Sequence, residues 1–161
     1  MPIRYVIAKN FDNKKLNNND LVVEISGGSP TQSTGRITII TNELLDRYER
    51  SLICTNFCRA LKPKNGYGMF IYFYWQYLYD KNAFFCYENG TTGIKNLDLG
   101  GFLTNEEIII PPIDLILKFD EQCQFIFRKI FTNGYQNEQL SILLNTLLPK
   151  LLKGDIDLSN I

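Results

Sequence analysis

The chain has 161 residues, of which 45% are hydrophobic and 13% aromatic, so it is long and apolar enough for one globular domain, and a disordered chain is excluded. It contains no histidine, which excludes Ser-His-Asp and Cys-His catalytic sites and metal sites with histidine ligands. Its 17 basic and 17 acidic residues give a net charge of zero, so charge alone gives no general attraction to nucleic acid.

The charges are unevenly distributed along the chain. Residues 1–65 contain ten lysines and arginines against six acidic residues, or +4, whereas residues 66–161 contain seven against eleven, or −4. We therefore expect any basic, partner-facing surface in the N-terminal part. The N-terminal ten residues lack the pattern of a secretory signal, and the four cysteines lie in mostly apolar contexts, so a reduced, cytoplasmic protein is expected. Only Cys54 and Cys58 are close together, so we expect no metal site and no cofactor.

The first predicted elements are two short β-branched strands, Leu21–Ser26 and Arg36–Ile40, which follow an Asn-rich turn at 17–20. Between them lies SGGSPTQSTGR (Ser26–Arg36), a polar segment that contains three glycines and one proline. Such a loop either merely turns the chain or contacts a partner. The residues alone leave both interpretations open.

A short helix over ELLDRYER is expected next, capped by Thr41 or Asn42, and the following segment to Pro63 is typical of strands. The run YGMFIYFYWQYLY (Tyr67–Tyr79) has apolar side chains all around the helical wheel. It therefore predicts a buried helix, with a base-stacking platform as the alternative. A second polar loop, ENGTTGIKN (Glu88–Asn96), is followed by a short apolar turn at LDLGGFL, a strand-like EIII and Pro111-Pro112.

The last fifty residues show apolar side chains in steps that alternate between three and four. The series runs through Ile116, Phe119, Cys123, Ile126, Ile130, Asn133, Asn137, Leu140, Leu144, Leu147 and Leu151. Because the phase survives the polar break at 132–137, the series predicts one long helix with a heptad seam, on which the two asparagines fix the register. Gly134 costs such a helix about 1 kcal/mol. An αα-hairpin that turns at TNGY is the alternative.

Three segments together resemble the specificity subunits of bacterial type I restriction-modification enzymes. NNNDLVVEISGGSPTQSTGRI resembles the strand-loop-strand of their target recognition domain, and YENGTTGIKNLDLGGFLTNEEIIIPPI resembles the segment that closes it. NEQLSILLNTLLPKLLKGDIDL resembles the end of the conserved helical region. Intact members of that family hold two recognition domains, each followed by a long helix, and this chain is similar to the second half only.

The resemblance implies an α+β fold, with a bent, mostly antiparallel sheet and packed helices, followed by a long C-terminal coiled-coil helix. The expected parts are an N-terminally clipped target recognition domain at 1–111, the long helix at 112–153 and a tail at 154–161. The implied function is non-catalytic: the chain reads a DNA half-site and docks the methyltransferase subunit, and through it the restriction subunit, by means of the helix. Without the missing half, two copies are expected to form a homodimer through their helices.

The resemblance also assigns residues to these roles. Glycines allow the backbone to approach phosphate, and short polar side chains pair with base edges. The implied DNA-binding residues are Ser26, Gly27, Gly28, Ser29, Thr31, Gln32, Ser33, Thr34, Gly35 and Arg36 in the first loop, and Asn89, Gly90, Thr91, Thr92, Gly93, Lys95 and Asn96 in the second. The implied helix-pairing residues are Ile116, Phe119, Ile126, Ile130, Leu140, Leu144, Leu147 and Leu151.

Two other functions stay open at this point. A phosphate-handling enzyme built on the glycine loop is disfavoured, because the loop lacks the GK[ST] ending of a P-loop and its flanks are typical of two strands rather than a strand and a helix. A coiled-coil scaffold that does not bind DNA, or the relic of a truncated specificity gene, agrees with the leucine seam. It differs from the first hypothesis only in DNA binding.

Overall fold

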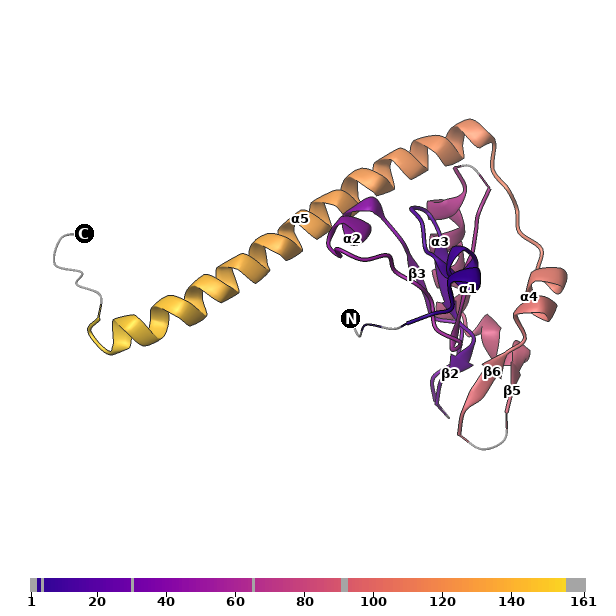
Figure 1. Ribbon diagram of the computed structural model, residues 1–161. Helices are drawn as coiled ribbons and strands as arrows, with labels where there is room; N and C mark the ends of the chain where they lie inside the picture. The colour runs from indigo at the N-terminus through magenta and orange to yellow at the C-terminus, as the bar shows by residue number, and fades with distance from the viewer. Residues whose placement is uncertain (1–2, 4, 30, 65, 91–92, 156–161) are drawn as a thin grey trace. The chain divides into compact units, whose positions relative to one another are not determined.

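The computed structural model describes residues 3, 5–29, 31–64, 66–90 and 93–155. Contacts divide the chain into two units, Met1–Gln124 (unit 1) and Phe125–Ile161 (unit 2). Figure 1 shows strands and short helices in unit 1, and a long C-terminal helix that is common to both units. The expected α+β class with a long C-terminal helix is confirmed.

In the described part of unit 1, the strands form two small antiparallel sheets. The first has the order β3–β1–β4, with β1 at Leu21–Glu24, β3 at Ile37–Ile39 and β4 at Cys58–Leu61. The second has the order β2–β6–β5, with β2 at Ser26–Gly27, β5 at Glu88–Asn89 and β6 at Lys95–Leu97. The strands predicted at 21–26 and 36–40 are therefore present, but the first one is split between the sheets.

Ile25 is the point where the chain passes from one sheet to the other. The backbone amides of Ile25 and Ser26 both donate to the carbonyl of Phe57, at 2.8 and 3.2 Å. Two residues thus oppose one, which is the arrangement of a β-bulge, and a bulge bends the strand and increases its twist. The sequence expectation of a strongly bent sheet has this local cause.

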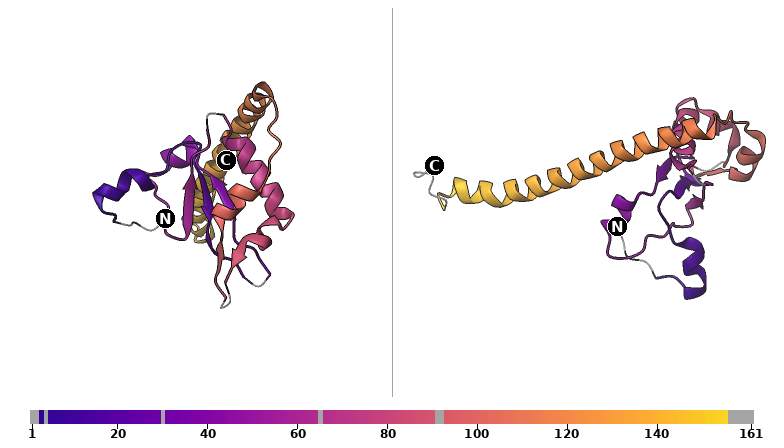
Figure 2. Two further views of the ribbon diagram at one scale, coloured as in Figure 1. Left: turned by 90° about the vertical axis from the view of Figure 1, so that its right-hand side faces the viewer. Right: turned by 90° about the horizontal axis from the view of Figure 1, so that it is seen from above.

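The helix α3 (Gly68–Asp80) packs against β3 and supplies the centre of the core (Figures 1 and 2). The ring of Trp75 lies 4.8 Å from the rings of both Phe84 and Phe102, centroid to centroid. Val23 and Leu97 complete this buried cluster. The aromatic run therefore fills the core through Trp75, as predicted, while Tyr77 on the opposite face stays exposed.

The other helices of unit 1 are short. They are α1 (Ala8–Lys14), α2 (Asn42–Asp46), the 3₁₀-helix η1 (Ala83–Tyr87) and α4 (Leu99–Asn105). The side chain of Thr41 accepts a hydrogen bond from the Leu44 amide and caps α2, as the sequence indicated. The helix α4 was not predicted, because the sequence suggested only an apolar turn there. Its start is capped by Asp98, whose side chain accepts a hydrogen bond from the Gly101 amide at 2.9 Å.

The prediction of a strand at EIII is wrong. Residues 107–110 all belong to the described part of the chain, and they form neither a strand nor a helix. Ile109 is 90% exposed, so the β-branched run has no sheet to join. High β-propensity describes how well a residue fits a half-buried sheet surface, and it cannot create a partner strand.

The C-terminal helix α5 is continuous from Ile113 to Leu152, so the long-helix prediction is confirmed and the αα-hairpin alternative is wrong. Its first turns pack within unit 1. Ile116 is 1% exposed, and the ring of Phe119 meets that of Phe73 edge to face at 5.7 Å. The buried Cys123 continues this contact face. Of these first seam positions, Ile116 and Cys123 are therefore covered by unit 1, whereas Phe119 stays 40% exposed.

In unit 2, the leucine-rich part of α5 is exposed. An open apolar groove runs along it, lined by Leu140, Leu143, Leu144, Leu147, Leu148 and Leu151. Pro149 lies in the last turns, and Gly154 with φ +73° follows the helix end in the left-handed conformation that commonly terminates helices. Within the residues the structure describes, no helix is sufficiently long and apolar to cross a lipid bilayer.

Candidate nucleic-acid interface

The two polar loops singled out in the sequence meet at one sheet. The first loop leaves β2, and the second loop connects β5 to β6. Because β6 pairs with β2 on one side and with β5 on the other, the bases of both loops lie side by side (Figure 1). Segments about sixty residues apart in the chain thus form one surface, as the shared DNA-binding assignment requires.

The tip of the first loop is a tight turn closed by Ser29. The Ser29 amide donates to the carbonyl of Gln32 at 2.9 Å, and the Ser29 hydroxyl accepts from the amides of Thr31 and Gln32. Gly28 has φ +74°, and a Cβ there would lie 2.9 Å from the Gln32 carbonyl oxygen. Glycine is therefore required for this turn, which leaves Thr31 and Gln32 exposed.

The second half of the same loop is buried against α3. The indole of Trp75 donates to the carbonyl of Gly35 at 2.6 Å, and the hydroxyl of Tyr79 donates to the carbonyl of Ser33 at 2.8 Å. Gly35 lies on the ring of Phe84, and an added Cβ would lie 3.1 Å from that ring, closer than most Cβ contacts. Core aromatic residues thus fix the path of this loop, although their sequence signal indicated only a buried helix.

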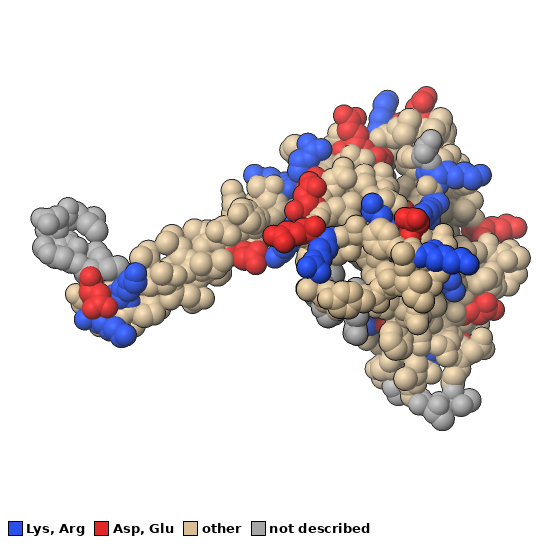
Figure 3. All heavy atoms as spheres, viewed as in Figure 1, with Lys and Arg blue, Asp and Glu red and all other residues tan. Residues whose placement is uncertain are grey.

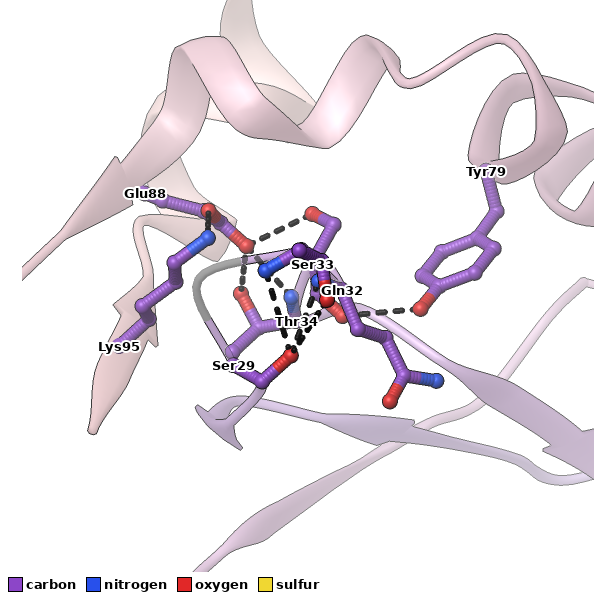
Figure 4. Close-up of polar contacts among 8 residues, drawn as sticks. Ser29, Gln32, Ser33, Thr34, Tyr79, Glu88 and Lys95 are labelled. Atoms are coloured by element: carbon purple, nitrogen blue, oxygen red, sulfur yellow. Dashed lines mark hydrogen bonds and ion pairs between the residues drawn. The ribbon is translucent and has the colours of Figure 1, made fainter. Parts of the chain in front are cut away.

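Glu88, at the start of β5, connects the two loops (Figure 4). One of its oxygens accepts from the hydroxyls of Ser33 and Thr34, at 2.7 and 3.0 Å, and from the amide of Thr34. The other forms an ion pair with Lys95 of β6, at 2.8 Å. Burial alone raises the pKa of Glu88, but the hydrogen bonds from Lys95, Ser33 and Thr34 together outweigh it and hold the pKa below its ordinary value.

The outer face of the second sheet carries a row of polar side chains. In the antiparallel register, Ser26 lies opposite Asn96, and Asn96 lies opposite Asn89, so these three side chains share a face. Lys95 and Leu97, on either side of Asn96, point to the other face, and Leu97 belongs to the core. Asn89 and Asn96 are exposed, and among the described residues their side-chain amides make no hydrogen bond.

Arg36 closes the first loop. Its guanidinium binds the carboxylate of Glu24 through two contacts, Nη2 to Oε1 at 2.6 Å and Nε to Oε2 at 3.0 Å. The Arg36 side chain remains 57% exposed, so the rest of its N–H groups face solvent. The hydrogen bond and charge of Glu24 raise the pKa of Arg36 further, so it stays protonated.

The predicted DNA-binding residues therefore divide by exposure. The exposed ones are Thr31, Gln32, Arg36, Asn89, Gly90, Gly93 and Asn96, the partly covered ones are Ser26, Gly27, Gly28, Ser29 and Lys95, and the buried ones are Ser33, Thr34 and Gly35. Thr91 and Thr92 lie outside the described residues. Glu88 was not predicted as part of the site, because a lone acidic residue before a glycine turn carries no signal of its partners.

The face of unit 1 shown in Figure 3 has few charged side chains near β2, β5 and β6, compared with its upper part. Among the residues that the structure describes, no group of three or more acidic or cysteine side chains is arranged to hold a metal ion. The exposed candidate side chains are the hydroxyl of Thr31, the amides of Gln32, Asn89 and Asn96, and the guanidinium of Arg36. Such groups make hydrogen bonds to base edges and phosphates.

Comparison with known proteins identifies the family. A profile of the type I restriction modification DNA specificity domain matches residues 3–143 of the chain. The chain belongs to this family. The resemblance found in the sequence is thereby confirmed, and membership in a family of DNA specificity domains implies recognition of a DNA sequence.

The chain is also similar to part of a longer protein. The chain is 35% identical over 68 residues to "Type I restriction enzyme HindI specificity subunit" of Haemophilus influenzae strain Rd. The matched stretch covers 42% of this chain and 15% of that protein. The chain therefore spans a small part of the relative, and the profile match includes both polar loops and α5 as far as Leu143.

Proposed function

We propose that this chain is a DNA-reading module of a type I restriction-modification system, which recognises a half-site with the two loops and the outer face of the β2–β6–β5 sheet. The observation that carries this proposal is the row of outward amides and hydroxyls on a sheet whose inner face is fixed by the core. Side-chain amides of Asn and Gln are suited to bidentate contact with adenine in the major groove. Gln32, Asn89 and Asn96 are the candidates, and Arg36 is the candidate for phosphate or guanine.

The test is selection of duplexes from a randomised pool by the wild-type chain, followed by titration of a recovered duplex and a shuffled one over a range of salt concentrations. We expect a consensus of a few base pairs, and a logarithmic salt slope of about −0.9 for each phosphate contacted. Replacing both Asn89 and Asn96 by alanine should relax the preference at specific positions, with a cost of about 1–3 kcal/mol for each lost base contact. A pool that yields no consensus would refute DNA reading by this chain.

The proposal extends to partner subunits. As a specificity module, the chain would have no catalytic step of its own; it would direct a methyltransferase subunit and, through it, a restriction subunit, in the cytoplasm. The exposed leucines of unit 2 support a docking role for α5, since exposed apolar patches mark interaction sites. Co-purification with a methyltransferase subunit of the same system, with masses read by light scattering, tests this part. A folded chain that forms no complex would contradict it.

A second candidate, a helical scaffold that does not bind DNA, is favoured by the leucine groove alone. The two candidates separate in the same pair of experiments. A scaffold would bind the methyltransferase subunit, while the recovered and shuffled duplexes would bind equally weakly. The recognition module would pass both tests.

A further inference from the structure

We propose that Glu88 is a positioning residue that makes the two DNA-facing loops into one recognition surface, and thereby sets discrimination between target and non-target DNA. The inference rests on the proposed DNA reading and deepens it. Glu88 itself points to the inner side of the sheet, since it lies opposite the core residue Leu97 in the register. Its effect on DNA is therefore indirect.

The contacts of Glu88 divide between the two loops. Oε1 holds the first loop at Ser33 and Thr34, and Oε2 holds the second through the ammonium of Lys95, which also lies 4.6 Å from the centroid of the Phe85 ring. Beyond Gly27 the first loop leaves the sheet, so β2–β6 pairing no longer ties it to the hairpin. The Glu88 carboxylate then provides the connection between the loops at the level of Ser33 and Thr34 (Figure 4).

Because this connection is buried, its loss would leave hydrogen-bond donors without an acceptor. The Glu88 side chain is 6% exposed, and Thr34 is fully buried. Trp75 and Tyr79 bind only the carbonyls of Gly35 and Ser33, so they do not satisfy the Thr34 amide or the two hydroxyls. Buried donors without an acceptor are costly, so the first loop keeps this path only while Glu88 accepts from it.

The outward groups depend on the same contacts. Gln32 immediately precedes Ser33, and Asn89 immediately follows Glu88, while Asn96 adjoins Lys95. Each candidate base-reading amide is therefore the chain neighbour of a residue in the Glu88 network. If the loops shifted relative to each other, these amides could no longer all meet their base edges at the same time. The attraction to phosphates does not depend on sequence and would remain.

The test compares Glu88→Gln with Glu107→Gln, an exposed position outside both loops that undergoes the same change in charge. Glu88→Gln replaces two acceptor oxygens by one at nearly constant size, so the side chain can no longer accept from both Lys95 and the first loop. The probes are a duplex that wild type recovers from a randomised pool and its shuffled version. The ratio of the two Kd values is measured together with hydrogen exchange of the Thr34 amide.

We expect Glu88→Gln to lower the target-to-shuffled ratio by about tenfold or more relative to Glu107→Gln, with the shuffled-duplex Kd values within about threefold of each other. Exchange at Thr34 should accelerate, and exchange at Val23 in the core should not. Equal loss on both duplexes, an unchanged ratio or unchanged Thr34 exchange would each overturn the inference while leaving the proposed function intact. If the wild-type chain selects no sequence, the proposed function fails and this inference fails with it.

A second pair of variants decides the matter if Glu88→Gln does not fold. Lys95→Met removes the ion pair but leaves the loop contacts of Glu88, and Lys95→Arg keeps a cation at that position. Positioning by Glu88 predicts a reduced ratio for Lys95→Met and a near wild-type ratio for Lys95→Arg. Equal ratios in the two variants would overturn the inference.

Discussion

Two buried carboxylates of unit 1 lie in opposite environments. Glu88 is surrounded by donors, whereas Asp120 of α5 is buried against α3, and its Oδ1 lacks a hydrogen-bond partner among the described residues. Burial raises the pKa of Asp120, and hydrogen bonds from the Gln124 side chain and the Met69 backbone offset this only in part. Folding thus lowers the pKa of Glu88 and raises the pKa of Asp120.

Asp120→Asn is expected to stabilise the protein at neutral pH. With its folded pKa raised, native Asp120 binds more protons than the unfolded chain between the ordinary pKa of about 4 and the raised value, so its contribution falls as pH rises through that interval. The gain of the variant over wild type should therefore be small at low pH, grow through the interval and then level off. Urea unfolding at a series of pH values measures it; a gain independent of pH would contradict this explanation.

Glu88→Gln should show the opposite sign in the same experiment. The lowered pKa of Glu88 gives the wild type a contribution that is present above the ordinary glutamate pKa of about 4.3 and is lost as pH falls through the folded value. The variant should be less stable than wild type at neutral pH and approach it in acid. Glu107→Gln, at an exposed carboxylate, is the reference for a charge change without burial.

A substitution at Gly35 tests whether the path of the first loop is fixed by its contact with Phe84. Its φ is +98°, and an added Cβ would lie 3.1 Å from the ring of Phe84. Gly35→Ala should cost about 1–3 kcal/mol for the backbone conformation, with a further penalty for displacing the ring. Gly93→Ala is the matched control, because Gly93 has φ +88° without any described atom within 4 Å of its Cβ position. Equal free energies of unfolding for the two variants would show that Phe84 yields without cost.

Among the helices and strands, the sequence predicted those that are determined by the pattern of neighbouring residues. The run of apolar side chains all around the helical wheel located α3, and the cap expected at Thr41 or Asn42 located the start of α2. The unbroken phase of the seam identified α5 as one helix. The strand expected at EIII failed because pairing needs a partner, and Pro111-Pro112 directly after it cannot donate to a ladder. The helix α4 escaped prediction because two glycines in its first turn conceal the cap at Asp98.

Because α5 is continuous, we predict that replacing Gly134 stabilises the helix. In a continuous helix, glycine is unfavourable and its added Cβ would have no described atom within 4 Å, so Gly134→Ala should stabilise the helix by about 1 kcal/mol. Circular dichroism should show equal or higher helicity and a raised melting temperature. Gly154→Ala, with φ +73° at the helix end, is the control and should destabilise. Lower helicity in Gly134→Ala would instead indicate a turn at TNGY.

At the scale of the whole molecule, the sequence indicated the loops but not what joins them. Composition marks both segments as polar and rich in glycine, and the family resemblance assigns them to DNA. Pairing of β2 with β6 links residues about seventy positions apart, and no local pattern encodes such a register. The buried roles of Ser33 and Thr34 follow from that long-range arrangement, so the sequence placed them with the outward residues Thr31 and Gln32.

From the leucine groove of unit 2 we predict that two copies of this chain associate through α5. Six leucines line the groove, and Leu144 and Leu147 lie at its centre. Antiparallel pairing of two such helices would bury these side chains in the way heptad positions do in coiled coils, and charges at that seam oppose it. Leu144→Lys with Leu147→Lys should therefore give monomers at concentrations where wild type is dimeric, as measured by light scattering.

Adding the same two charges outside the groove separates the seam from general repulsion. Gln139 and Asn145 are exposed on α5 and do not line the groove, so Gln139→Lys with Asn145→Lys should remain dimeric. Both double variants should keep the far-ultraviolet helical signal, because lysine is a good helix former. A wild-type chain that is monomeric at high concentration would refute self-pairing, and the exposed leucines would then be assigned to the helix of a different protein.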